Sequence, residues 1–471
     1  MTIDVKSMAQ IAAELEGYDP QAVSADDVLR FLAKLVMPVQ ASSDVPLFEA
    51  LGRVLAADVI SPFDVPPHDN SAMDGYAFDG QRLNSGTLNL EVVGTAFAGK
   101  AWQGTVRTGQ CVKIMTGAIM PAGLDTVVPQ ELVAVHTEPV EVSAAASTSS
   151  ARTESITISP KLLKAGDNRR HRGEDLLQGK PALLKGELLT PARLGLAASL
   201  GLKTVRCYQP LKVAYFSTGD EILSLGEPLR EGAVYDSNRY TVFGLLTRMG
   251  CQVIDMGVVR DDPALLEAAF KQAAARADAI ITSGGVSVGE ADHTKAMMKK
   301  LGEVEFWRIA MRPGRPMAVG RIEKPAFNIV LGDKSASSPS NKGASSYENR
   351  SEASSCILFG LPGNPVAVMV TFLAFVRPAL LQMMGANATP QPLLKARSIE
   401  AMRKKPGRTE YQRGWVSNAV DGTLQVRTTG NQGSGVLSSM AQANGLIVLH
   451  HAQADIAAGD TVDVLMFDGA I

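Results

Sequence analysis

Residues 277–302, ADAIITSGGVSVGEADHTKAMMKKLG, contain the pattern that decides the fold. Residues 277–283 are a short, mostly apolar run of the kind found in buried strands, and residues 293–302 carry apolar positions at helical spacing. The glycine-rich segment between them, residues 284–292, leads from the expected strand into the expected helix. A strand, a glycine-rich turn and a helix in this order are typical of α/β proteins.

The same alternation extends over residues 210–385. Expected strands are LKVAYFS (211–217), CQVIDMGVV (251–259), ADAIITS (277–283) and CILFGL (356–361), and expected helices are NRYTVFGLLTRMG (238–250), DPALLEAAFKQAAARA (262–277), HTKAMMKKLG (293–302) and PVAVMVTFLAFV (365–376). Alternation of this kind predicts a three-layer α/β domain, in which a parallel-type sheet has helices on both faces.

The pattern of apolar residues and glycines changes on both sides of this block. Ser24 is a suitable N-cap for the helical pattern DDVLRFLAKLV, whereas short apolar runs and glycine turns follow residue 60 and residue 388. Two serine-rich stretches, 143–155 and 335–355, are too poor in apolar residues to pack, so we interpret them as solvated insertions. We expect four parts: a helical linker of residues 20–60 and 180–209, an inserted β-rich domain of residues 61–179, an α/β domain of residues 210–387, and a C-terminal barrel or sandwich of residues 388–471.

Composition narrows the class of protein. The chain has 471 residues, and 46 Lys and Arg against 48 Asp and Glu give a net charge of −2. That balance disfavours nucleic acid and anionic membranes as partners, and 5% aromatic residues disfavour base stacking. We see no signal peptide, and the longest strongly apolar stretch, 366–376, is too short to cross a bilayer. Four widely spaced cysteines suit a reducing compartment, so we expect a cytoplasmic protein.

Glycine-rich turns follow three of the expected strands. They are STGDE (217–221), TSGGVSVGEAD (282–292) and GLPGNP (360–365). Carboxyl ends of parallel strands meet at one sheet edge, where glycines let backbone N–H groups approach a phosphate closely. Any one of these turns is explained equally well as a tight connection, but three at one edge favour a binding site. Its candidate residues are Gly284, Gly285, Pro362, Gly363, Asn364 and Pro365.

Carboxylates accompany these turns. Asp220, Glu221, Asp261 and Asp292 are expected at the same edge, where a bound phosphate would repel them unless a cation lies between. Mg²⁺ fits, because it takes one or two carboxylates together with phosphate oxygens. For Asp261 an N-terminal helix cap is an equally good explanation.

Arginines and further polar runs complete the candidate residues. Arg312 and Arg315 lie on a loop that proline and glycine stiffen, so their guanidinium groups are suited to an oxyanion; a solvated basic turn is the alternative. In the β-rich block, Asp74, Thr116 and Asp175 belong to dense polar runs that a fold does not need for stability. A charged surface is an equally good explanation for the arginine-rich run among them.

Together these residues resemble the MoeA family and the related E domain of gephyrin. The resemblance is carried by DNSAMDGYA (69–77), MTGA with PxG (115–123), RRHRGED (169–175), STGDE (217–221), YDSNR (235–239), TSGGVSVGEADHTK (282–295), RPGRP (312–316), GLPGNP (360–365), GRTEYQRG (407–414) and TTGNQGS (428–434). It implies a β-barrel as the C-terminal domain, and a homodimer whose active cleft is shared between subunits. Asp74, Thr116 and Asp175 would then reach the cleft of the partner subunit.

The resemblance also implies a reaction. Molybdenum from molybdate enters adenylylated molybdopterin, AMP is released with the help of Mg²⁺, and molybdenum cofactor forms. The implied catalytic residues are Asp292, Glu221, Asp220, Asp74, Thr116 and Asp175; the implied Mg²⁺ ligands are Asp220, Glu221, Asp261 and Asp292; and the implied molybdate-binding residues are Arg312, Arg315, Ser287, Arg413 and Ser438. Arg312 and Arg315 stand where the family usually has lysine.

Partners and alternatives follow from the same resemblance. A molybdopterin adenylyltransferase and molybdoenzyme apoproteins are expected partners of such an enzyme. Two other functions fit the α/β pattern: a molybdopterin adenylyltransferase, which would be a lone α/β domain, and a non-catalytic scaffold, which would not need the anion-binding and metal-binding groups.

Overall fold

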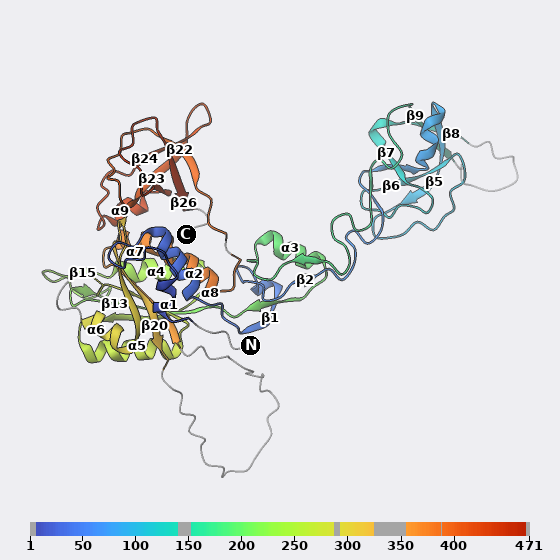
Figure 1. Cartoon of the computed structure of the whole chain (residues 1–471). Helices are drawn as coiled ribbons and strands as arrows, with labels where there is room; N and C mark the ends of the chain where they lie inside the picture. The colour runs from blue at the N-terminus through green and yellow to red at the C-terminus, as the bar shows by residue number, and fades with distance from the viewer. Residues whose placement is uncertain (1–5, 140–151, 287–292, 325–354, 388, 468–471) are drawn as a thin grey trace, which may run out of the picture. The chain divides into compact units, whose positions relative to one another are not determined.

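The computed structural model describes residues 6–139, 152–286, 293–324, 355–387 and 389–467 (Figure 1). The chain divides into two compact units. Unit 1 contains Met1–Ala57, Lys185–Leu194 and Lys203–Ile471, and unit 2 contains Asp58–Leu184 and Gly195–Leu202. Helix α3 (Pro191–Ser199) begins in the first and ends in the second.

The centre of unit 1 is a six-stranded sheet. Its strand order is β16 (Gln252–Val259), β13 (Lys212–Thr218), β17 (Ala279–Ser283), β21 (Ser355–Leu361), β20 (Pro316–Glu323) and β18 (Gly302–Arg308). The first four strands are parallel, as the alternating pattern predicts. Their carboxyl ends therefore lie at one edge of the sheet.

The last two strands differ from a purely parallel sheet. β20 is antiparallel to both β21 and β18. β18 and β20 are separated by only residues 309–315, which is enough for an antiparallel pair but too short for the crossover that a parallel pair needs. The short connection explains why the sheet is mixed.

Helices cover both faces of this sheet. In β13, Val213 and Tyr215 face the cluster that contains α4 (Ser237–Arg248) and α7 (Pro365–Thr371), whereas Ala214 and Phe216 face the opposite cluster. The second cluster contains residues of α5 (Pro263–Arg276) and α6 (His293–Leu301), which lie beside each other in Figure 1. Every residue of β17 is buried, as expected for a strand covered on both sides. The three-layer arrangement is confirmed.

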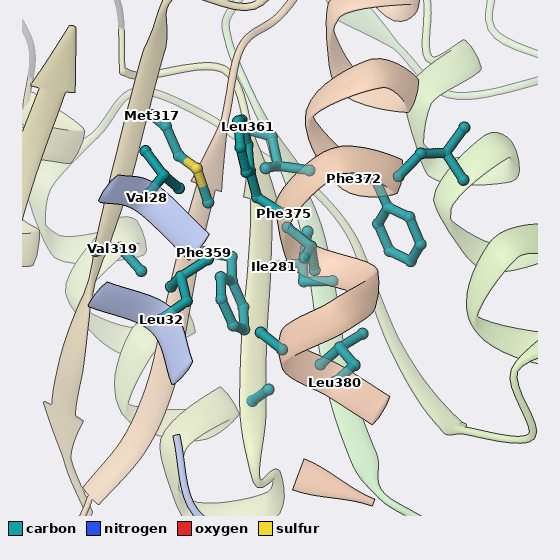
Figure 2. Packing of buried hydrophobic residues seen from close by; sticks show 14 of the residues in the cluster. Val28, Leu32, Ile281, Met317, Val319, Phe359, Leu361, Phe372, Phe375 and Leu380 are labelled. Atoms are coloured by element: carbon teal, nitrogen blue, oxygen red, sulfur yellow. The ribbon is translucent and has the colours of Figure 1, made fainter. Parts of the chain in front are cut away.

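The larger of the two cores joins the sheet to the N-terminal helices. Figure 2 shows Phe359 and Ile281 of the sheet packed beside Phe375, with Val28 and Leu32 of α2 (Ala25–Leu35) on the same side. Ser24 caps α2 by accepting a hydrogen bond from the Asp27 backbone N–H at 3.1 Å, as the sequence predicts. α1 (Met8–Ala13) precedes α2.

One apolar helical run is longer than the sequence pattern indicated. α7, a π-helical turn (Phe372–Val376) and α8 (Arg377–Met383) form a continuous segment, Pro365–Met383, of 19 residues with a mean hydropathy of 1.8. By length and composition alone this segment could cross a membrane, so the argument from residues 366–376 was wrong. Because 67% of its most apolar window is buried inside the protein, packing against the sheet accounts for its composition.

The expectation of a helical segment over residues 20–60 and 180–209 is only partly correct. β1 (Ser42–Pro46) and β12 (Thr204–Tyr208) form an antiparallel ladder within these ranges. In β12, Val205 and Cys207 are buried while the intervening residues are not, which is the period of a strand. The ladder joins residues more than 150 positions apart. The spacing of apolar residues within a short segment contains no information about such a distant partner, so the strand pair was not expected.

The C-terminal part of unit 1 is a closed barrel. Strands β23 (Thr409–Asn418), β24 (Leu424–Thr428), β22 (Leu394–Ser398), β26 (Thr461–Met466) and β25 (Gly445–Leu449) pair in this order, and β25 pairs with β23 to complete the ring. The short β19 (Met311–Arg312) pairs in parallel with β23, so the RPGRP loop is attached to the barrel. Helix α9 (Leu437–Ala441) follows β24.

Unit 2 is built on a curled six-stranded sheet. Its strand order is β7 (Thr126–Pro129), β4 (Gly75–Phe78), β6 (Gln110–Ile114), β5 (Leu88–Ala96), β9 (Arg152–Ile158) and β8 (Ala134–Pro139). Two small ladders join β3 (Asn70–Ser71) to β10 (Arg169–Arg170), and β2 (Val59–Ile60) to β11 (Pro181–Leu183). Short 3₁₀ turns occupy Gly80–Ser85 and Gln130–Leu132 of this unit, and a third, Leu47–Glu49, belongs to unit 1. The fold class is thus as expected, while the exact boundaries of the four parts remain predictions.

Candidate active site

A cavity of about 880 Å³ lies at the carboxyl ends of the parallel strands of unit 1. Three of its walls come from the turns after β13, β17 and β21, and the others come from residues 234–238 before and at the start of α4, from the RPGRP loop and from the barrel loop 432–435. Among the residues singled out from the sequence, the cavity is lined by Glu221, Gly284, Gly285, Arg312, Pro362, Gly363, Asn364 and Pro365. Cavities of this size accept organic ligands of drug size.

The glycine turn after β17 is built for a close approach of backbones. Gly284 has φ +92°, and a Cβ there would lie 2.4 Å from the carbonyl oxygen of Thr218. The Gly284 N–H donates to the Leu361 carbonyl at 3.1 Å. Gly284 therefore lies between the ends of β13 and β21, where no side chain fits. The following residues of this turn, including Ser287 and Asp292, lie outside the described residues.

The RPGRP loop is equally tight. Gly314 has φ +92°, and a Cβ there would lie 2.4 Å from Thr371 Oγ1 of α7. The loop thus lies close against the helix, with Arg312 exposed and lining the cavity. Arg312 forms no ion pair with any residue of the described ranges. Arg315 is also exposed, but it is not among the residues that line the cavity.

Arg413 has a different position from Arg312. Its side chain is only 1% exposed; its Nε donates to Ser439 Oγ at 2.9 Å, and its Nη2 donates to the carbonyl oxygens of Asn431 and Gly433 at 3.1 and 3.0 Å. Burial, with a smaller contribution from the charge of Arg312, lowers the pKa of Arg413 to about 10, so it stays charged at neutral pH. Arg413 thus holds the barrel loop that lines the cavity.

The barrel loop was quoted among the family strings, but its lining residues were not singled out. Gln432, Gly433, Ser434 and Gly435 all line the cavity. The Ser434 carbonyl accepts a hydrogen bond from the Val366 N–H at 3.1 Å, which joins the loop to the first turn of α7. Ser438 lies on α9, exposed and not among the lining residues, next to the buried Ser439.

Three of the four expected acidic residues lie within the described ranges. Glu221 lines the cavity, whereas Asp220 and Asp261 lie at neighbouring turns, with the Asp261 N–H 3.4 Å from Asp220 Oδ1. Within the described ranges no three His, Cys, Asp or Glu side chains form a cluster that could enclose a metal ion. One or two carboxylates that share a cation with phosphate oxygens are compatible with this arrangement, because Mg²⁺ seldom uses an all-protein cage.

Two polar residues of the string YDSNR also line the cavity, and the sequence did not single them out as site residues. Asp236 and Asn238 both line the cavity and are 3% and 8% exposed. The Tyr215 hydroxyl forms hydrogen bonds with Ser217 at 2.9 Å and Ser283 at 2.7 Å, and both serines also line the cavity. In a sequence, an Asp that precedes a helix is normally explained as its N-cap. Only the burial of these residues and their unpaired oxygens, which are known from the structure, distinguish them from an ordinary cap.

In unit 2 the candidate residues lie on turns. The Asp74 carboxylate accepts hydrogen bonds from the Thr116 backbone N–H at 2.6 Å and from its hydroxyl at 2.7 Å, and these bonds lower the pKa of Asp74. Asp175 is exposed, and its backbone N–H donates to Val65 at 3.0 Å. Asp74 and Thr116 are therefore in direct contact, which the sequence did not predict.

The arginine-rich run is tied to the rest of unit 2 through Asp69. Asp69 accepts a hydrogen bond from the Arg172 backbone N–H at 2.7 Å and pairs with Arg169, and these interactions hold the pKa of Asp69 below its usual value against the opposing effect of burial. A carboxylate with a lowered folded-state pKa contributes stability above its unfolded pKa of about 3.9, and this stability is lost as the pH falls through the folded pKa.

We therefore expect unit 2 to lose stability below about pH 4, and Asp69→Asn to make this loss shallower. The measurement is the unfolding temperature from about pH 3 to 6, followed for both proteins. Asp175→Asn is the matched control, because the Asp175 side chain forms no hydrogen bond with the described residues. If the unfolding temperature of Asp69→Asn falls with pH as steeply as that of the wild type, Asp69 does not make this contribution to stability.

Comparison with known proteins agrees with this geometry. Three family profiles match in chain order: the MoeA N-terminal region (domain I and II) over residues 23–201, a probable molybdopterin binding domain over residues 214–382, and the MoeA C-terminal region (domain IV) over residues 395–467. A molybdopterin molybdenumtransferase of Haemophilus influenzae is 39% identical, covering 93% of this chain and 97% of the relative. One of Nostoc sp. is 32% identical, covering 99% and 98%.

A solved structure extends the agreement to the fold. The molybdopterin biosynthesis moeA protein of Pyrococcus horikoshii superposes with a TM-score of 0.70 at 25% identity, covering 95% of this chain and all of that one. The fold, the cavity and these relatives define an enzyme of molybdenum cofactor biosynthesis. More particularly, the chain belongs to the MoeA family. A lone-domain adenylyltransferase is excluded as a description of the chain, because the family match includes unit 2 and the barrel.

Proposed function

We propose that this enzyme transfers molybdenum from molybdate to adenylylated molybdopterin, with Mg²⁺-dependent release of AMP. The observation that carries the proposal is a cavity that the glycine turns, Glu221 and Arg312 line together, with Arg312 in no ion pair with the residues that the structure describes. The glycine turns offer the backbone donors that a substrate with phosphates needs, and Arg312 offers a fixed cation for a tetrahedral oxyanion. Glu221 offers a carboxylate that can share a metal ion with phosphate oxygens.

Anion binding is assigned to two parts of the cavity. The turn that contains Gly284 and the turn of Gly363 and Asn364 would hold the phosphate groups, because their backbones face the cavity without side chains between. Arg312 would bind molybdate, with Arg315, Ser287 and Ser438 as further candidates. Arg413 would contribute its charge from behind the barrel loop.

Mg²⁺ would be held by carboxylates at the same edge. Glu221 is the ligand that the cavity favours most, with Asp220, Asp261 and Asp292 as the remaining candidates. When bound, the ion supplies Lewis-acid polarisation of phosphate oxygens at the bond that releases AMP. The carboxylates would hold and orient the ion, and sharing it would relieve the repulsion between their negative charges and those of the substrate.

The active assembly is proposed to be a homodimer in the cytoplasm. Asp74, Thr116 and Asp175 of one subunit would complete the cleft of the partner, which explains why turns of unit 2 carry hydrogen-bonded polar groups at exposed positions. A molybdopterin adenylyltransferase would supply the substrate, and molybdoenzyme apoproteins would receive the product.

The test is AMP release from adenylylated molybdopterin by the purified protein with Mg²⁺, with and without molybdate. We expect release that depends on both Mg²⁺ and molybdate. Release stimulated far more by tungstate than by molybdate would change the metal that is transferred. No release from a folded dimer under any of these conditions would overturn the proposal and favour the scaffold.

In the same assay we expect Arg312→Ala to raise the KM for molybdate by about tenfold or more, because a hydrogen bond to a charged group is lost. Arg312→Lys should recover part of the effect, since it restores the charge without the bidentate fork. Arg248→Ala removes an exposed arginine at the far end of α4 and is expected to leave the KM unchanged. An unchanged KM in Arg312→Ala would remove this residue from the molybdate site.

A further inference from the structure

The string YDSNR (235–239) has no role in the proposed chemistry, although two of its side chains bind segments outside α4. Asn238 Nδ2 donates to the Gly363 carbonyl at 2.7 Å. The Arg239 guanidinium binds the Asp255 carboxylate, with Nε–Oδ1 and Nη2–Oδ2 distances of 2.8 and 2.6 Å. The first turn of α4 is therefore attached to two other parts of unit 1.

These two attachments lie at opposite sides of the parallel part of the sheet. Asp255 belongs to β16, and Gly363 comes two residues after the end of β21. In the order β16, β13, β17, β21, these are the first and the last of the parallel strands. The start of α4 thus connects both sides of the edge at which the cavity lies. Because Asp255 already binds Arg239, this cation serves the connection rather than a substrate anion.

The turn that Asn238 binds has few other constraints. Two of its four residues, 362–365, are prolines without a backbone N–H, and the two between them are exposed. Among the described residues, Asn238 alone forms a side-chain hydrogen bond with this turn. Asn238 is only 8% exposed, so water cannot easily replace the bond. Loss of the Asn238 amide would therefore release the turn.

The position of this turn matters because a second glycine turn lies beside it. A Cβ added to Gly363 would lie 3.9 Å from the Cα of Gly284. The Gly284 N–H also donates to the carbonyl of Leu361, at the end of β21, at 3.1 Å. Both turns are assigned to phosphate groups in the proposed function. Donors on two separate segments bind one ligand well only when their spacing is fixed before the ligand arrives.

We propose that Asn238 is a positioning residue, which holds the turn 362–365 at a fixed distance from the Gly284 turn and thereby sets the affinity for the substrate. The effect on affinity rests on the proposed function, whereas the hold on the turn does not. Asn238 acts through the Gly363 carbonyl and not on the reacting atoms. A neutral amide suits this task, because it donates to the carbonyl without adding a charge beside the phosphates.

The first test is hydrogen exchange on the whole protein, which requires no activity. Two amides flank the turn and are bonded at 3.1 Å: that of Gly284 to the Leu361 carbonyl, and that of Val366 to the Ser434 carbonyl. In Asn238→Ala both should exchange about tenfold faster or more, because loss of a buried hydrogen bond makes local opening easier.

Asn238→Asp is the second variant, and it keeps the size of the side chain. A carboxylate in the first turn of a helix is favoured by the helix dipole, so α4 should persist. The carboxylate cannot donate to the Gly363 carbonyl, so exchange should be at least as fast as in Asn238→Ala. The unfolding temperature of each variant shows that the protein under test is folded.

The second test uses the AMP-release assay. We expect both variants to raise the KM for adenylylated molybdopterin by about tenfold or more and to change kcat by much less, because the turn contributes binding rather than chemistry. A variant that merely unfolds part of the enzyme would lower the apparent kcat and leave the KM unchanged.

Asn444→Ala is the matched control. Asn444 Nδ2 donates to the Val416 carbonyl at 2.8 Å, which is the same kind of bond, and Asn444 does not line the cavity. This variant should keep the wild-type KM and the wild-type exchange at Gly284 and Val366. If it raised the KM as much as Asn238→Ala does, the effect would be one of general stability, and the positioning role would be wrong.

The remaining outcomes separate this role from the proposed function. Wild-type exchange at Gly284 and Val366 in folded Asn238→Ala would overturn the hold on the turn. Faster exchange with an unchanged KM would overturn the effect on affinity. If exchange changes as expected but the wild-type protein releases no AMP, Asn238 still positions the turn and the proposed reaction is wrong.

Discussion

Gly284→Ala is expected to abolish activity and to lower the free energy of unfolding of unit 1 by about 3 kcal/mol. At φ +92° an alanine is strained whatever the space around it, and its Cβ would lie 2.4 Å from the Thr218 carbonyl oxygen. That oxygen belongs to the backbone of a central strand, so it cannot move away as a flexible side chain could. The ends of β13 and β17 would have to separate, which would open the cavity wall.

Gly244→Ala is the matched control for this prediction. Gly244 lies within α4, is exposed, and has no heavy atom within 4 Å of an added Cβ. Alanine there should raise stability by about 0.5–1 kcal/mol through helix propensity. Chemical denaturation of both variants gives the comparison. If Gly284→Ala were as stable as Gly244→Ala, the close approach of Gly284 to Thr218 would be wrong.

The turns at the cavity could be predicted because the information that defines them is local. A strand such as 279–283, with glycines directly after it, places those glycines at the carboxyl edge of a parallel sheet whatever the strand order is. Gly284, Gly285 and the 362–365 turn therefore line the cavity together, although their position was inferred without any knowledge of which strands pair.

Features that depend on distant partners could not be predicted in this way. The antiparallel direction of β20 and the pairing of β1 with β12 follow from chain connections and contacts across the fold, which leave no period in the sequence. Asp236 illustrates the same limit within the site. Its sequence context predicts a helix cap, and it is one, but the residue also lines a cavity that exists only in the folded protein.

For Arg413, the family resemblance and the contacts in the structure suggest different roles. The family resemblance implied a ligand of molybdate, whereas the structure shows a buried guanidinium that binds two carbonyl oxygens of the barrel loop and the Ser439 hydroxyl. We expect Arg413→Met, which keeps much of the side-chain volume, to lower the free energy of unfolding by about 2–3 kcal/mol, because it leaves several acceptors without donors. Ser439→Ala removes only one of these bonds and should cost about 1 kcal/mol.

Hydrogen exchange distinguishes the two roles of Arg413. If it positions the loop, the amides of residues 432–435 should exchange faster in Arg413→Met, and this change should be present without molybdate. If it acts only as an anion ligand, exchange and stability should match the wild type, and only the KM for molybdate should rise. The charge of Arg312 lowers the pKa of Arg413, which means that the two cations repel each other before any anion arrives. A dianion bound by Arg312 would remove that repulsion, so molybdate should slow exchange in the loop of the wild-type protein and lose this effect in Arg312→Ala.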